Sequence, residues 1–137
     1  MTNFFDKINK LFAFLPRKYG FLETERLFDK QCFGNAVLVL SSKCLKFIFT
    51  RDRDFDSVSI ALIGEEDEFD LQILKAYILA DPIEGEYIKK VNLKSIAKFV
   101  NDNYEKINDE FSKIKYSRTR RELKKLQIIR YKKLMSR

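Results

Sequence analysis

Hydrophobic residues near the start of the chain recur at steps of three and four, which is the spacing of an amphipathic helix. The positions that follow this spacing are Phe4, Phe5, Ile8, Leu11, Phe12 and Leu15. Asn3 is suited to cap the first turn, and Asp6 suits the positive end of a helix. Because Pro16 lacks the N–H that a continuing helix requires, we predict one helix over residues 4–15 that ends at Pro16.

The pattern then changes to alternating apolar and polar positions separated by short polar turns, which is typical of β-strands. The predicted strands cover residues 21–28, 36–40, 45–50 and 57–62. Residues 36–40 are nearly all apolar, as expected of a central strand. A parallel crossover needs roughly a dozen residues, so the short links predict antiparallel neighbours and a meander.

Helical spacing returns after the last of these strands. We expect Glu65–Glu68 to open a second helix, because acidic side chains favour the positive end of a helix. Asp81 and Pro82 are expected to end it. Asn92 is expected to cap a third helix that runs from residue 93 to about 114.

A fourth helix is expected to begin near Ser117 or Thr119. Its apolar positions are Leu123, Leu126, Ile129 and Leu134. Together the patterns predict a single α+β domain over residues 1–137, with an antiparallel three- to four-stranded meander packed against an N-terminal helix and a long C-terminal helical region.

The sequence shows no signal for a membrane or for secretion. No apolar run approaches the roughly 20 residues that a membrane-spanning helix needs. The first 16 residues lack the basic leader and small-residue cleavage site of a secretory signal. The two cysteines, Cys32 and Cys44, are too few for a disulfide framework and are predicted to be buried or half-buried free thiols. We therefore expect a cytoplasmic protein without membrane contact.

The composition argues against much of the chemistry that enzymes use. The chain contains no His, which excludes a Ser-His-Asp triad, a Cys-His dyad and the common zinc sites. The paired carboxylates Glu23 and Glu25, and likewise Glu84 and Glu86, lack an accompanying base, nucleophile or phosphate-binding loop. We therefore expect no catalytic residues, no cofactor, no metal site and no small-molecule substrate.

The charge is unevenly distributed along the chain. The net charge is +7, but residues 113–137 hold eleven Lys or Arg and one acid, which gives this segment +10. The first 112 residues hold 16 bases and 19 acids, which gives −3. Such an asymmetry predicts the chemistry of partners and not the fold.

Two charged clusters are candidate contacts for a protein partner. The first consists of Glu65, Glu66, Asp67, Glu68 and Asp70, which suit a basic partner surface, although they also suit the start of a helix. The second is the turn between the last two predicted strands, with Arg51, Asp52, Arg53 and Asp54. Its alternating carboxylates resemble the ligands of a hard cation, but the turn lacks the length, central Gly and distal Glu of a calcium loop. We interpret it as a charged hairpin tip.

The basic fourth helix supports an alternative. Its cations are Arg118, Arg120, Arg121, Lys124, Lys125, Arg130, Lys132 and Lys133, which are suited to phosphate contacts. Only Tyr116 and Tyr131 are available there to stack on bases. If the leucines of this helix are buried and its cations are scattered, the helix is interpreted as a solvated structural element. If the cations form one exposed stripe, the helix is interpreted as a binding site for a polyanion.

Three stretches carry a resemblance: Tyr19-Gly20-Phe21, residues 33–40 and residues 46–53. In their order along the chain, these stretches resemble a set of small uncharacterised bacterial α+β proteins that share a long helix and a basic terminal helix. Some such proteins accompany toxins as immunity proteins. The glycine usual after Arg-Asp-Arg is Asp54 here. The resemblance implies no catalytic residues.

These observations lead to two hypotheses. We expect a non-enzymatic binding protein of the immunity or antitoxin type, which occludes a protein partner such as a toxin. The alternative is a nucleic-acid-binding protein that uses the basic C-terminal helix.

Overall fold

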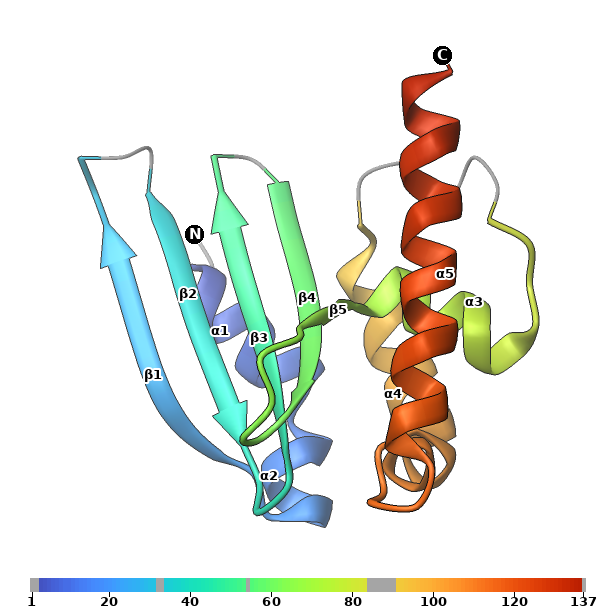
Figure 1. The fold of residues 1–137 in the computed structure, drawn as a ribbon. Coiled ribbons are helices and arrows are strands. Elements are labelled where there is room, and N and C mark those ends of the chain that lie inside the picture. Colours follow the sequence, from blue (N-terminus) through green and yellow to red (C-terminus); the bar gives the residue numbers. More distant parts are fainter. Residues whose placement is uncertain (1–2, 32–33, 54, 84–90, 137) are drawn as a thin grey trace.

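A computed structural model describes residues 3–31, 34–53, 55–83 and 91–136 of the chain. Within these residues, two short helices come first, α1 (Phe4–Leu11) and α2 (Phe14–Tyr19). Five strands follow: β1 (Leu22–Asp29), β2 (Asn35–Ser41), β3 (Leu45–Asp52), β4 (Phe55–Leu62) and β5 (Phe69–Asp70). The last helices are α3 (Leu71–Leu79), α4 (Leu93–Glu110) and α5 (Tyr116–Met135), as Figure 1 shows.

The strands form one antiparallel sheet in the order β1-β2-β3-β4-β5, so each strand pairs with its neighbour in sequence (Figure 1). This confirms the predicted α+β class and the meander. The short strand β5 was not predicted from the sequence. It pairs with β4 through Ile60 and Phe69, and Phe69 is almost fully buried. The pairing therefore brings an aromatic ring into the core immediately before α3.

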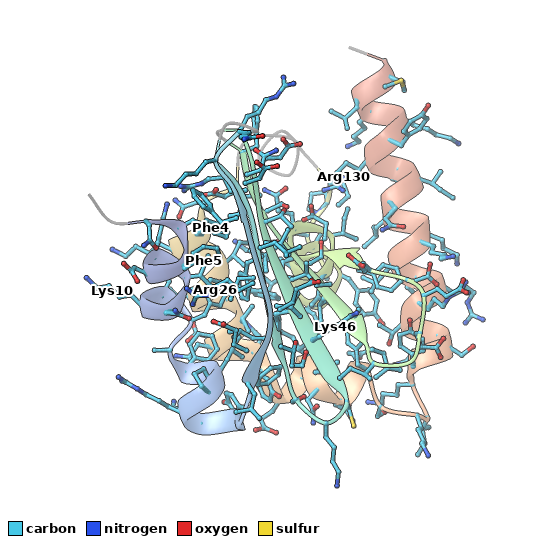
Figure 2. All side chains as sticks on the ribbon, turned by 90° about the vertical axis from the view of Figure 1, so that its left-hand side faces the viewer. Phe4, Phe5, Lys10, Arg26, Lys46 and Arg130 are labelled. Atoms are coloured by element: carbon cyan, nitrogen blue, oxygen red, sulfur yellow. The ribbon has the colours of Figure 1, made fainter. Side chains whose placement is uncertain are left out.

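One face of the sheet carries the core. Leu38, Phe49 and Val58 are cross-strand neighbours on β2, β3 and β4, and each is at most 1% exposed. The ring of Phe12 packs against Phe49 with a centroid separation of 4.7 Å. In the edge-on view the N-terminal helices lie against one side of the sheet (Figure 2), and α5 lies beyond the β4–β5 edge, beside α3 and α4 (Figure 1).

The N-terminal helix differs from the prediction, because the chain forms two helices where one was expected. Asn3 caps α1 as predicted, since its Oδ1 accepts a hydrogen bond from Asp6 N at 2.8 Å. Pro16 does not end a helix but lies in the first turn of α2. A proline is tolerated there because the first N–H groups of a helix have no acceptor within the helix. Gly20 ends α2 with a φ of 71°, a conformation that glycine adopts without strain.

The prediction that Glu65–Glu68 opens a helix is wrong. These residues lie in the connection that leads to β5, and α3 begins only at Leu71. Asp70 is the N-cap, with its Oδ1 accepting a hydrogen bond from Gln72 N at 2.7 Å. Because Phe69 is held in the sheet, the helix cannot begin earlier.

The last two helices are close to the prediction. Asn92 caps α4, as its Oδ1 accepts from Ser95 N at 3.1 Å. The helix ends at Glu110 and not near residue 114, so Ile114 is 94% exposed instead of packed. Cys44 is also exposed instead of buried, because it lies in the turn between β2 and β3.

Several predicted features lie outside the described residues: Cys32, Asp54, Glu84 and Glu86. No helix in the described ranges combines the length and the apolar character required to cross a bilayer.

Candidate functional site

The structure separates the two groups of predicted protein contacts. Arg51–Arg53 lie at one end of the β3–β4 hairpin, whereas Glu65–Asp70 follow the opposite end of β4. The eight residues of β4 span about 26 Å at the usual rise of a strand. The two groups are therefore distinct surfaces.

Arg51, at the hairpin tip, is a structural residue. Its Nε donates to Asp56 Oδ1 at 2.7 Å, and its second guanidinium nitrogen donates to Asp56 Oδ2 at 3.1 Å. The Asp56 side chain is only 8% exposed, and Lys7 Nζ approaches it at 3.7 Å. The guanidinium carbon of Arg51 also lies 5.0 Å from the centroid of the Phe4 ring. Arg51 therefore ties the hairpin to α1 instead of presenting its charge to a partner.

A second interaction joins the two hairpins at this end of the sheet. Arg53 N donates to Asn35 Oδ1 at 2.7 Å, across 18 positions in sequence. Arg53 has a φ of 61°, a left-handed conformation that costs a non-glycine residue about 1 kcal/mol or more. The hydrogen bond to Asn35 helps to hold it there. This hydrogen bond therefore links the end of β3 to the start of β2.

The same end of the sheet exposes large apolar side chains. Leu27 is 57% exposed, Phe28 55% and Phe55 65%. A hollow of about 650 Å³ opens between the ends of β1, β2 and β3, and its lining includes Leu27, Phe28 and Asp52. Asp52 and Arg53 are exposed at the neighbouring turn. We call Leu27, Phe28, Asp52, Arg53 and Phe55 the tip surface.

The acidic stretch is partly occupied by the protein's own basic helix. Arg120 Nε donates to Asp67 Oδ2 at 2.5 Å, and Lys124 Nζ lies 3.4 Å from Asp67 Oδ1. The hydrogen bond from Arg120, together with the nearby positive charge, lowers the pKa of Asp67 below its ordinary value. Asp67, which was predicted to contact a protein partner, is therefore bound to Arg120 and Lys124, which were predicted to contact nucleic acid.

Asp70 has a similar internal role. Besides capping α3, its Oδ2 lies 3.6 Å from a guanidinium nitrogen of Arg130, which is largely buried at 22% exposure. In Figure 2 the Arg130 side chain points from α5 toward the rest of the fold. Glu65, Glu66 and Glu68 are exposed, and they remain accessible to a partner.

The eight predicted cations of α5 do not form one exposed stripe. Arg120, Lys124 and Arg130 face Asp67 or Asp70, and Lys133 Nζ donates to the carbonyl oxygen of Ile83. Arg118 lies 3.7 Å from Glu110, and Arg121 and Lys125 lie 3.9 and 3.3 Å from Glu122. Lys132 is exposed. The cations are distributed around the helix, which favours a solvated helix over a dedicated polyanion site.

The first half of α5 is anchored by buried side chains, whereas the second half is held by the polar contacts of Arg130 and Lys133. Tyr116, Thr119 and Leu123 are buried, and Leu123 is 0% exposed. Thr119 Oγ1 donates at 2.7 Å to both the backbone carbonyl and the Oε2 of Glu110. Of the apolar residues predicted to pack, Leu126 is half-buried, whereas Ile129 and Leu134 are 42% and 39% exposed. The apolar positions of this helix are therefore packed only as far as Leu126.

Sequence reasoning missed the apolar part of the tip surface. Phe28 directly follows Leu27, and such an apolar pair at the end of a predicted strand does not by itself indicate which side chain is exposed. Its exposure results from the position of β1 at the edge of the sheet, where all eight residues are exposed. Strand order is a tertiary property, so no local signal was available.

Within the described ranges, no group of three or more His, Cys, Asp or Glu side chains is arranged to hold a metal ion. No protein-family model, curated protein or solved structure matches the chain.

Proposed function

We propose that this chain is a non-catalytic protein-binding module of the immunity or antitoxin type, which acts by occluding a surface of its partner. The observation that carries the proposal is the tip surface, where Leu27, Phe28 and Phe55 are each more than half exposed beside a hollow of about 650 Å³. Aromatic residues and arginine are enriched in protein–protein interfaces relative to the rest of the surface.

The chemistry of the hollow indicates the kind of contact that it suits. Leu27 and Val37, which are cross-strand neighbours on β1 and β2, give it an apolar wall, and Asn35, Thr50 and Asp52 give it polar edges. This combination suits an apolar side chain projecting from a protein partner, with hydrogen bonds around it. The protein partner's projecting side chain would lose its exposure to water on binding, which is the source of the affinity.

Hydrogen bonds across the strands at the tip support the same function. Arg53 N donates to Asn35, and Arg51 donates to Asp56, so β2, β3 and β4 are linked at this end of the sheet. A surface that is already ordered loses less conformational entropy when a partner docks. An inhibitor that acts by blocking a partner benefits from this pre-organisation, because tight occlusion is its whole mechanism.

The acidic stretch has a secondary role in this proposal. Asp67 and Asp70 are engaged with α5, so only Glu65, Glu66 and Glu68 remain to steer a basic partner. Steering of this kind affects the association rate more than the affinity. Binding of nucleic acid by α5 stays an alternative prediction, with less support because the cations are distributed around the helix.

The experiment is affinity capture from a lysate of the source organism with two matched variants of β1. Leu27→Asp alters the tip surface, and Leu22→Asp alters the other end of the same strand, where Leu22 is 71% exposed. We expect a protein to be captured by the wild type and by Leu22→Asp but not by Leu27→Asp.

The captured protein is then expressed with each form of the chain. The proposal requires that the wild type and Leu22→Asp suppress its toxicity or activity and that Leu27→Asp does not. Equal capture by all three forms, or a captured protein whose activity is unaffected, would refute it.

A further inference from the structure

The second half of α5 carries an apolar stripe that no part of the described fold covers. Ile128, Tyr131 and Leu134 follow one another at steps of three and are 56%, 62% and 39% exposed. Together with Asp67 and Lys124 they line a hollow of about 570 Å³. From Lys124 to Leu134 the stripe extends about 15 Å along the helix, which corresponds to roughly three turns.

The two sides of this hollow carry opposite charge. On the α5 side, the chain after Glu122 contains six Lys or Arg and no acid. On the other side, Asp67 comes from the acidic connection and is paired with Arg120 and Lys124. Among the described residues of this rim, the unpaired negative charge is that of Glu66 and Glu68, which flank Asp67 and are exposed. The edge-on view shows α5 standing away from the sheet along its upper half (Figure 2).

The opposite charges on the two sides of the hollow restrict the kind of molecule that can bind there. A nucleic acid or an anionic membrane surface is uniformly negative and would meet the carboxylates of the acidic connection. A uniformly basic segment would be repelled by α5 for the same reason. An amphipathic helix with acidic residues along one flank and basic residues along the other satisfies both walls and buries its apolar ridge on the stripe.

We propose that the hollow between α5 and the acidic connection is a second binding surface, which receives an amphipathic helix of a protein partner with one acidic and one basic flank. The apolar ridge of that helix contacts Ile128, Tyr131 and Leu134. Its acidic flank faces the exposed cations of α5, such as Lys125 and Lys132. The surface is separate from the tip surface and does not depend on it.

The chain offers a matched pair of variants for the test. Ile128 lines the hollow, whereas its neighbour Ile129 does not and is 42% exposed. Ile128→Ser and Ile129→Ser remove similar apolar side chains from adjacent positions of one exposed helix, so their effects on folding should be alike. Circular dichroism of both variants establishes that α5 is intact.

The probes are fluorescein-labelled synthetic helices that share one leucine ridge. One has a Glu flank and a Lys flank, a second has Glu on both flanks, a third has Lys on both, and a fourth is a scramble of the first. Binding to the full chain is measured by fluorescence anisotropy. We expect the mixed-flank peptide to bind at least tenfold more tightly than the other three, and Ile128→Ser but not Ile129→Ser to weaken it at least tenfold.

The other occupants are outcomes of the same experiment. Phosphatidylglycerol vesicles and a single-stranded oligonucleotide are tested against the same variants. Tighter binding of either one with the same dependence on Ile128 would overturn the proposal, and so would equal binding of the mixed and scrambled peptides. Neither result would affect the tip surface, whose test uses different residues.

Discussion

Arg120 and Asp67, which are 53 positions apart in sequence, form an ion pair with an Nε–Oδ2 distance of 2.5 Å. The pair joins the most acidic stretch of the chain to its most basic helix. It therefore satisfies part of each charge cluster within the molecule. The apolar tip of the sheet and the far half of α5 lie outside this charge pairing and are exposed.

The ion pair predicts a pH dependence of stability. Because the pKa of Asp67 is lowered in the folded protein, its contribution is present above the ordinary carboxyl pKa and is lost as the pH falls through the folded value. We expect Asp67→Asn to lower the free energy of unfolding at pH 6 by less than about 1 kcal/mol, since the pair is partly exposed. Urea denaturation at pH 6 and pH 3 measures this. A difference between the two proteins that is as large at pH 3 as at pH 6 would contradict the assignment.

The anchoring of α5 predicts unequal effects of two leucine substitutions. Leu123 is 0% exposed and Leu134 is 39% exposed on the same helix. Leu123→Ala should destabilise the protein by about 2–5 kcal/mol, because it leaves a cavity in the core. Leu134→Ala should cost less than about 1 kcal/mol. Chemical denaturation of the two variants provides the comparison, and equal losses would show that α5 packs along its whole length.

The buried hydroxyl of Thr119 predicts a second contrast. Thr119 Oγ1 donates to Glu110 at 2.7 Å, and the Glu110 carboxylate is held in a largely buried position. Thr119→Val keeps the shape but removes the donor, which should cost about 1–3 kcal/mol. Thr119→Ser retains the hydroxyl and should recover much of that loss. If both variants lose the same stability, the hydrogen bond does not contribute as described.

Some features of the fold follow from local sequence patterns, and others follow from contacts between residues that are far apart in the sequence. Alternation in Leu45, Phe47 and Phe49 is a local property, and these residues are buried on one face as predicted. The caps Asn3 and Asn92 are equally local and were also predicted correctly. Local patterns were therefore sufficient for the meander and for the starts of two helices.

The candidate site depends on contacts between residues that are far apart in the sequence. Nothing near Asp67 in sequence indicates that Arg120 would be its partner, because several acids and cations were equally available. Because Phe69 pairs with Ile60 in the sheet, α3 begins at Leu71 and not at Glu65–Glu68. This pairing is also a contact between separate elements of the fold. Exposure of Phe28 follows from the order of the strands. These features required the tertiary structure.

The dependence of stability on alkaline pH tests the burial of Tyr104. Tyr104 stacks on Tyr19 with ring centroids 3.6 Å apart, and burial raises the pKa of Tyr104 to about 12. A raised pKa stabilises the fold below the ordinary tyrosine value near 10, and this contribution is lost as the pH rises toward 12. Wild type should lose up to about 2 kcal/mol more than Tyr104→Phe between these limits. Guanidinium denaturation across the range checks this, and parallel curves for the two proteins would contradict it.

The central claim is that the chain works by presenting the tip surface to a protein partner. The most direct measurement is the dissociation constant of the captured partner for wild type, Leu27→Asp and Leu22→Asp, determined by calorimetry with purified proteins. We expect Leu27→Asp to weaken binding at least a hundredfold and Leu22→Asp to leave it within threefold of wild type. Equal dissociation constants for the three proteins would contradict the account.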